Sequence, residues 1–216
     1  EWRSIAHAEA ETGLLFMRGE ADVTITSPHG TNATSLSAGV AERVSYGWPR
    51  GDLLLLPPSW TATIAPRTST ADLLIFQAWL PEGARYGLPG WARGNEAAYE
   101  RHSATCLVRS YVPGIIGARR LRVGTVENAD GYGSYPQHKN SWHREEIRIY
   151  DIQPEGGEAI QRLRGQYVTG AEVDTAAVVR TGDACVLPCG DTSVFTAVNS
   201  AVAYTWAWIE TEDSSA

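Results

Sequence analysis

The residues most able to do chemistry lie between positions 138 and 150. His138 and Asn140 are two residues apart, and Glu145 and Glu146 follow shortly after them. An imidazole two positions before a second side chain on a strand, with a carboxylate on the next strand, is an arrangement that holds a divalent metal in a small β-barrel. Because the second side chain is an amide, the pattern predicts a weakened metal site with His138 and Glu146 as ligands.

Alternation along a strand decides which side chains accompany the carboxylate. If Glu146 points inward, Arg148 and Tyr150 point inward with it. A buried carboxylate, guanidinium and phenol are costly unless they are hydrated, mutually paired or functional. We therefore predict a functional pocket, with a buried structural network as the alternative. Glu145 competes with Glu146 for the ligand position, and His143 is an alternative imidazole.

The sequence predicts that the elements that position these residues are strands. Short alternating or β-branched runs bounded by Gly, Pro, Asn and Asp recur along the chain, and helical periodicity is almost absent. This pattern is typical of an all-β sandwich or barrel. The only segment with helical character covers residues 94–102. Strands near the candidate site are predicted at residues 146–152, 158–163, 184–187 and 203–209.

An internal repeat predicts two similar barrels. Gly51–Pro57 and Gly182–Pro188 share the pattern Gly-Asp, four apolar-leaning residues and Pro, and they lie 131 residues apart. Gly-Asp makes a tight turn into a buried strand, and Pro ends the strand where no backbone donor is needed. We expect an N-terminal barrel over residues 1–80, a linker over 81–104, and a C-terminal barrel over 105–216 that carries the candidate site.

Composition limits the class of partner. The chain has 216 residues, a hydrophobic content of 43% and a net charge of −7. The acidic balance argues against a nucleic-acid or anionic-membrane partner. No apolar run approaches the ~20 residues that span a bilayer. The three cysteines form no disulfide framework. We expect a cytoplasmic protein that binds a small molecule.

Two motifs carry a resemblance to a known family. The run from Gly182 to Gly190 reads Gly-(x)5-Pro-x-Gly, which is similar to the second motif of the cupin superfamily. Residues 134–140 read Ser-Tyr-Pro-Gln-His-Lys-Asn, which resembles the Ser-Tyr-Pro-Pro-His-Lys-His segment of the bicupin sugar-acid isomerases, 5-deoxy-glucuronate isomerase above all. The Glu-Glu-Ile at 145–147 and the Gln-Arg pair at 161–162 follow at matching spacing. The resemblance covers most of the chain and implies an all-β bicupin, with two tandem cupin barrels of the double-stranded β-helix or jelly-roll type.

The resemblance also implies a degenerate metal site. The four ligand positions of the family correspond to His138, Asn140, Glu146 and Thr192, so two imidazoles are replaced by an amide and a hydroxyl. Neutral oxygens are poor replacements for imidazole at a borderline-soft divalent ion. The expected cofactor is therefore none, or a weakly bound divalent metal (Zn, Mn, Fe or Ni).

By resemblance, the activity is an isomerisation of the aldose–ketose type on a small sugar-acid-like substrate. Such a reaction needs a base that moves a proton and a group that stabilises the enediolate oxygen. Without a metal, Arg148 or Lys139 could stabilise the oxygen while Glu146 or His138 shuttles the proton. The predicted catalytic residues are Glu146, His138, Arg148 and Tyr150, and the predicted substrate-binding residues are Lys139, Asn140, Gln161, Arg162 and Thr192. Only one of Gln161 and Arg162 can line the cavity, because they alternate.

Two other functions stay open. A diverged cupin enzyme could catalyse a metal-free cyclisation, dehydration or isomerisation, and a bicupin could bind a small ligand without turning it over. Tyr204, Trp206 and Trp208 share one face of the last strand, where we expect them in the core between sheets. Long edge strands and this aromatic stripe make a homodimer plausible.

Overall fold

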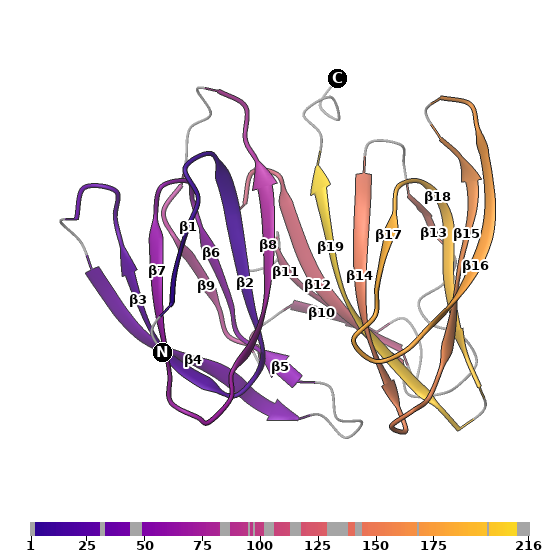
Figure 1. Ribbon diagram of the computed structural model, residues 1–216, viewed down its shortest axis with the longest axis horizontal. Helices are drawn as coiled ribbons and strands as arrows, with labels where there is room; N and C mark the ends of the chain where they lie inside the picture. The colour runs from indigo at the N-terminus through magenta and orange to yellow at the C-terminus, as the bar shows by residue number, and fades with distance from the viewer. Residues whose placement is uncertain are drawn as a thin grey trace. The chain divides into compact units, whose positions relative to one another are not determined.

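The fold is built from strands alone in the residues that can be described. The structure is a computed structural model that describes residues 3–30, 33–43, 49–82, 87–94, 96, 98–101, 106–112, 118–128, 138–140, 144–167, 169–197 and 199–210 (Figure 1). These residues form no helix. The helical segment predicted at 94–102 is therefore wrong, because Ala98–Arg101 forms strand β10, which pairs antiparallel with β11 (Cys106–Val112). Pairing with a neighbouring strand overrides the weak helical preference of this segment.

The chain divides into two compact units. The first comprises Glu1–Val44, Pro49–Ala97 and Tyr111–Leu121, and the second comprises Ser45–Trp48, Ala98–Ser110 and Arg122–Ala216. The segment 81–104, which we predicted as a linker, contains β9 and β10, one in each unit.

The first unit consists of two sheets around an apolar core. Their strand orders are β1-β7-β3-β4-β5 and β8-β2-β6-β9. The buried cluster includes Leu14, Phe16, Val23 and Leu54, and Trp60 packs against it. The strand bounds are β1 Arg3–Ala6, β2 Ala10–Arg18, β3 Glu20–Thr26, β4 Ala33–Arg43, β5 Pro49–Gly51, β6 Leu53–Leu56, β7 Thr61–Pro66, β8 Asp72–Trp79 and β9 Gly90–Ala92.

The second unit pairs a six-stranded sheet, β10-β11-β12-β19-β14-β17, with a four-stranded sheet, β13-β18-β15-β16. Its apolar cluster includes Val126, Ile152, Val194 and Val202. It also buries several polar side chains on β14, β15 and β18. The remaining bounds are β12 Leu121–Asn128, β13 His138–Asn140, β14 Arg144–Gln153, β15 Ala159–Gln166, β16 Glu172–Val179, β17 Ala184–Leu187, β18 Gly190–Thr196 and β19 Ala201–Glu210.

Both copies of the Gly-Asp repeat turn into a short strand, β6 in one unit and β17 in the other. Asp52 is buried and accepts hydrogen bonds from the backbone amides of Gly39 (3.2 Å) and Gly94 (2.9 Å) and from Nη1 of Arg93 (3.2 Å). Burial raises the pKa of Asp52, and these hydrogen bonds oppose that rise. Asp183 is exposed and accepts a bond from the backbone amide of Arg180 (2.8 Å). In both copies of the repeat, the aspartate therefore holds the turn through hydrogen bonds that its side chain accepts. This side chain is buried in the first unit and exposed in the second.

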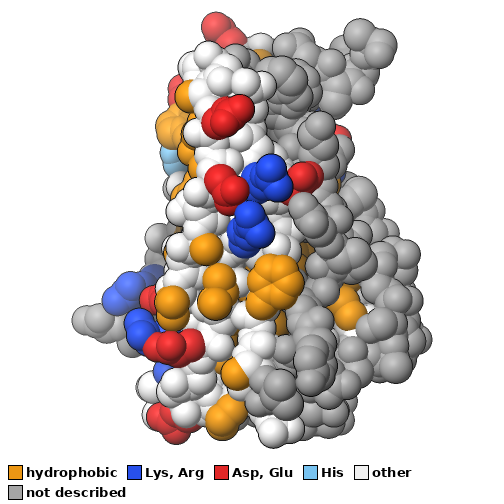
Figure 2. Space-filling view, turned by 90° about the vertical axis from the view of Figure 1, so that its right-hand side faces the viewer, with side chains coloured by type: hydrophobic (Ala, Val, Ile, Leu, Met, Phe, Trp, Pro, Cys, Tyr) orange, Lys and Arg blue, Asp and Glu red, His pale blue; other side chains and the backbone are white. Residues whose placement is uncertain are grey.

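The outer face of the four-stranded sheet carries an apolar row beside a charged one. Phe195, Ile160 and Val178 lie directly opposite one another on β18, β15 and β16, and each is about half exposed. Figure 2 shows apolar side chains gathered on this face next to basic and acidic ones. None of the described residues belongs to a helix long and apolar enough to cross a membrane.

Candidate functional site

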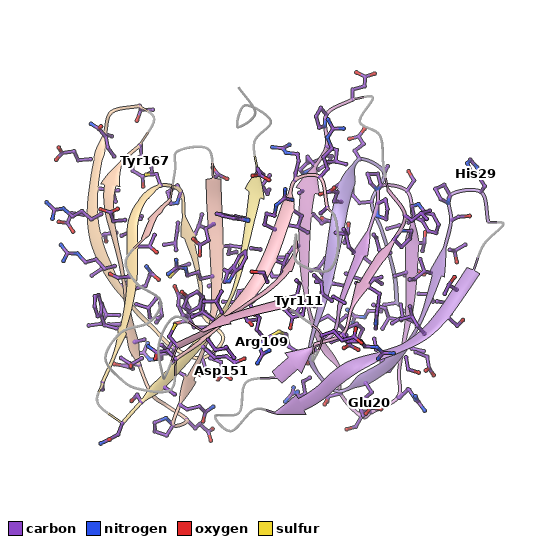
Figure 3. All side chains as sticks on the ribbon, turned by 180° about the vertical axis from the view of Figure 1, so that it is seen from behind. Glu20, His29, Arg109, Tyr111, Asp151 and Tyr167 are labelled. Carbon is purple, nitrogen blue, oxygen red and sulfur yellow. The ribbon has the colours of Figure 1, made fainter. Side chains whose placement is uncertain are left out.

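The candidate site is organised by β14, which lies between β19 and β17 in the six-stranded sheet. Glu146, Arg148 and Tyr150 are 5%, 1% and 1% exposed, whereas their neighbour Glu145 is exposed. Asp151, labelled in Figure 3, follows Tyr150 and is only partly buried. Strand alternation therefore places a carboxylate, a guanidinium and a phenol together on the buried face of one strand.

Arg148 is the centre of the polar cluster. Its Nε donates to Oε1 of Glu146 at 2.5 Å, and its Nη1 donates to Oε1 of Gln161 at 3.2 Å. Its Nη2 donates to the hydroxyl of Thr192 at 2.6 Å. The guanidinium carbon lies 4.7 Å from the ring centre of Tyr204. The planar fork of one arginine thus links β14 to β15 and β18, which belong to the opposite sheet.

Gln161 is held in one orientation by its other partners. The hydroxyl of Tyr150 donates to Oε1 of Gln161 at 2.6 Å, and Nε2 of Gln161 donates to the carbonyl oxygen of Arg162 at 2.7 Å. Oε1 therefore faces both Tyr150 and Arg148, and it accepts from each. This arrangement fixes the amide, and the hydrogen bonds join the side chains of five strand residues into one network: Glu146, Arg148, Tyr150, Gln161 and Thr192.

The cluster keeps a charged guanidinium and a neutral Tyr150 phenol inside the unit. Burial lowers the pKa of Arg148, but Tyr204 and Glu146 outweigh that effect, so the pKa stays above its ordinary value. Burial raises the pKa of Tyr150, and the nearby Arg148 only partly opposes the rise. At neutral pH the guanidinium is therefore charged and the Tyr150 hydroxyl is a hydrogen-bond donor.

Thr192 reaches the cluster because of the glycine that starts its strand. Gly190 has φ of +84°, and a Cβ there would lie 2.5 Å from the carbonyl oxygen of Arg164. Only glycine fits this close approach, which gives a physical reason for the final Gly of the Pro-x-Gly motif. Two residues on, Thr192 is fully buried and lies opposite Leu163 of β15.

The structure places the other predicted residues as follows. Of the Gln161 and Arg162 pair, Gln161 points inward, whereas Arg162 is 49% exposed and forms an ion pair with Asp174 at 3.2 Å on the outer face. Arg162 therefore does not join the cluster. On β13, His138 lies opposite Thr192, Lys139 opposite Asp191 and Asn140 opposite Gly190 in the backbone pairing. The side chains of these three β13 residues, and all of His143, lie outside the described residues.

Tyr204 is the member of the cluster that the sequence did not identify as a site residue. It lies opposite Tyr150 on β19, and Trp206 and Trp208 lie opposite Arg148 and Glu146. Directly opposed residues of an antiparallel pair share a face, so the aromatic stripe shares the face of the polar cluster. Tyr204 is buried in the apolar core, as the sequence predicts for the stripe, and its ring also covers the guanidinium. The signal available in the sequence was the matching alternation of the two strands.

A divalent metal does not fit the described donors. No group of three or more His, Cys, Asp or Glu side chains that could hold a metal exists among the described residues. The convergent oxygens of Glu146, Gln161 and Thr192 already surround the guanidinium of Arg148. A divalent ion within about 4 Å of that charge would meet a repulsion of about 8 kcal/mol at an effective dielectric constant near 20.

Comparisons with known proteins concern the fold. No family model and no curated protein matches the sequence. The chain is similar to the crystal structure of an IolB-like protein from Salmonella typhimurium, with a TM-score of 0.77, 20% identity, and coverage of 97% of this chain and 79% of the other. It is similar to Bacillus subtilis oxalate decarboxylase, a protein with Mn(II) centres, with a TM-score of 0.62, 14% identity and coverage of 99% of this chain. The chain spans 66% of that enzyme, less than two thirds of its length.

A third similar structure is the protein Ylba from Escherichia coli, with a TM-score of 0.59, 13% identity, and coverage of 96% of this chain and 70% of the other. Identities of 20% and below establish the fold alone. The all-β cupin fold predicted from the sequence is thereby confirmed.

Proposed function

We propose that the second unit binds a small polar acid and moves a proton between two adjacent carbons, as in an aldose–ketose isomerisation. The observation that carries this proposal is the buried Glu146–Arg148 pair, with Nε and Oε1 only 2.5 Å apart. The pair places a carboxylate base next to a fixed positive charge, on the face of β14 that is turned toward the opposite sheet. The likeness to an IolB-like protein supports this reaction class.

The proposed reaction uses the pair in two roles. Glu146 takes the proton from the carbon beside the substrate carbonyl, and the electron pair of that C–H bond forms the enediolate. Arg148 stabilises the negative oxygen that develops, as an oxyanion-binding group. Glu146 then returns the proton to the neighbouring carbon, so the substrate is isomerised with no net change in atoms or electrons. We assign His138, whose strand position is opposite Thr192, to proton exchange at the substrate oxygens.

The test uses two neighbouring carboxylates that differ in burial. Purified protein is incubated in D2O with 5-deoxy-glucuronate and related uronates, with and without chelator, and deuterium incorporation is followed by NMR. We expect Glu146→Gln to abolish exchange and turnover, and Glu145→Gln, at the exposed neighbour, to leave both unchanged. Unchanged activity in Glu146→Gln would remove the assignment.

A different chemistry is the second candidate, because the guanidinium already holds the oxygens that a metal would need. Metal-free cyclisation, dehydration or isomerisation of another small acid would use the same acid–base pair. Its sign would be turnover of a non-uronate substrate that survives chelation. Tight binding of a sugar acid with no deuterium exchange and no product would instead identify a ligand-binding protein.

A further inference from the structure

The polar cluster has the construction of a cation site. Three oxygens of different chemical type, a carboxylate, an amide and a hydroxyl, converge from Glu146 on β14, Gln161 on β15 and Thr192 on β18. All three side chains are at least nine-tenths buried. Buried oxygens need hydrogen-bond donors to offset their loss of water, and the carboxylate among them also needs a positive charge.

The charge among these oxygens belongs to the protein itself. Arg148 is 1% exposed, and each of its three guanidinium nitrogens donates to a different one of the three oxygens. The face of the Tyr204 ring lies 4.7 Å from the guanidinium carbon and adds a cation–π contact. A guanidinium presents its donors in a rigid planar fork, which neither a spherical ion nor a lysine ammonium reproduces. The side chain is therefore fixed at the centre of the donor set.

We infer that the Arg148 guanidinium takes the place of a divalent metal in this barrel, so that the wild-type protein excludes metal and binds the anionic oxygen of its ligand through arginine. This inference concerns the site of the proposed function and rests on it for the ligand class, a small carboxylate. It adds that the site works without a metal. The weakly bound metal expected at His138 and Glu146 is then replaced by a permanent organic cation.

The test asks whether removal of the guanidinium creates a metal site. The changes Asn140→His and Thr192→His supply imidazoles on the two paired strands β13 and β18. In that pairing His138 lies opposite Thr192, and Asn140 lies opposite Gly190. The double variant keeps Arg148 and is the matched control. The triple variant adds Arg148→Met. Metal content after dialysis against Mn²⁺ or Zn²⁺ and chelator treatment is measured by mass spectrometry, and affinity is measured by titration calorimetry.

We expect the wild type and the double variant to retain far less than one equivalent, and the triple variant to retain about one equivalent with affinity at least about tenfold higher than the double variant. One chelator-resistant equivalent in the wild type would overturn the inference, as would equal affinity in the double and triple variants. The wild-type titration needs no variant, so it decides the matter even if the triple variant does not fold.

The outcome for metal is separate from the outcome for activity. A metal-free wild type with no turnover of any uronate would remove the proposed function and leave the inference standing. A wild type that isomerises a uronate only with a bound metal would overturn the inference and leave the proposed function standing.

Discussion

Removing Glu146 and Arg148 singly and together tests how strongly the two charges depend on each other. Glu146→Gln leaves a buried guanidinium without its counter-charge, and Arg148→Met leaves a buried carboxylate. Removal of one partner from a buried ion pair costs about 3–5 kcal/mol of unfolding free energy. The double variant has no unpaired charge, and it loses mainly the donors to Gln161 and Thr192, at about 1–3 kcal/mol in total.

The expected double-mutant cycle is therefore strongly non-additive. The single changes sum to about 6–10 kcal/mol, and the double change should cost at least about 3 kcal/mol less than that sum. Urea unfolding, followed by tryptophan fluorescence and far-UV circular dichroism, gives each free energy by linear extrapolation. Glu145→Gln is the control and should stay within about 0.5 kcal/mol of wild type. Additivity of Glu146→Gln and Arg148→Met within about 0.5 kcal/mol would refute a paired, buried cluster.

Two further predictions concern the phenol and the Gly-Asp turns. Tyr150→Phe removes a buried donor to Gln161 and should cost about 1–2 kcal/mol near neutral pH by urea unfolding. Because burial raises the Tyr150 pKa, the folded state holds the phenol proton more tightly than the unfolded state does. The resulting contribution to the free energy of unfolding is fully present below about pH 10. It is lost as the pH rises further, at up to about 1.4 kcal/mol per pH unit. In Tyr150→Phe the free energy of unfolding should fall less steeply with pH above about pH 10. An unchanged pH dependence would contradict a buried Tyr150 hydroxyl with a raised pKa. Asp52→Ala removes the acceptor of two backbone amides and should lower the free energy of unfolding by about 2–4 kcal/mol. Asp183→Ala, at the exposed turn, should lower it by under about 1 kcal/mol in the same measurement. Equal losses would show that burial does not distinguish the two turns.

Local patterns in the sequence predicted most of the fold. The Gly-Asp repeat marks the turns into β6 and β17, and alternation from Glu146 to Tyr150 predicts the buried face of β14. These features depend on near neighbours in the chain, so a single sequence reveals them. The helical segment at 94–102 was wrong because β10 is stabilised by its pairing with β11, which no local pattern encodes.

The centre of the site depended on contacts far apart in sequence. Arg148 bonds to Gln161 and Thr192, which are 13 and 44 residues away. Which of Gln161 and Arg162 faces inward is set by the register of β15 against β18, and a one-residue slip would exchange them. The sequence could therefore predict the polar members of the network but not Tyr204, and it could not predict that arginine is the residue to which the others bind.

The apolar row of Phe195, Ile160 and Val178 bears on how the protein behaves in concentrated solution. Solvent-facing aromatic and branched side chains attract apolar patches on other molecules, and the net charge of −7 at pH 7 opposes that association. That charge vanishes near the isoelectric point of about 5.2. Precipitation and light scattering should therefore rise sharply as acid is added toward that value.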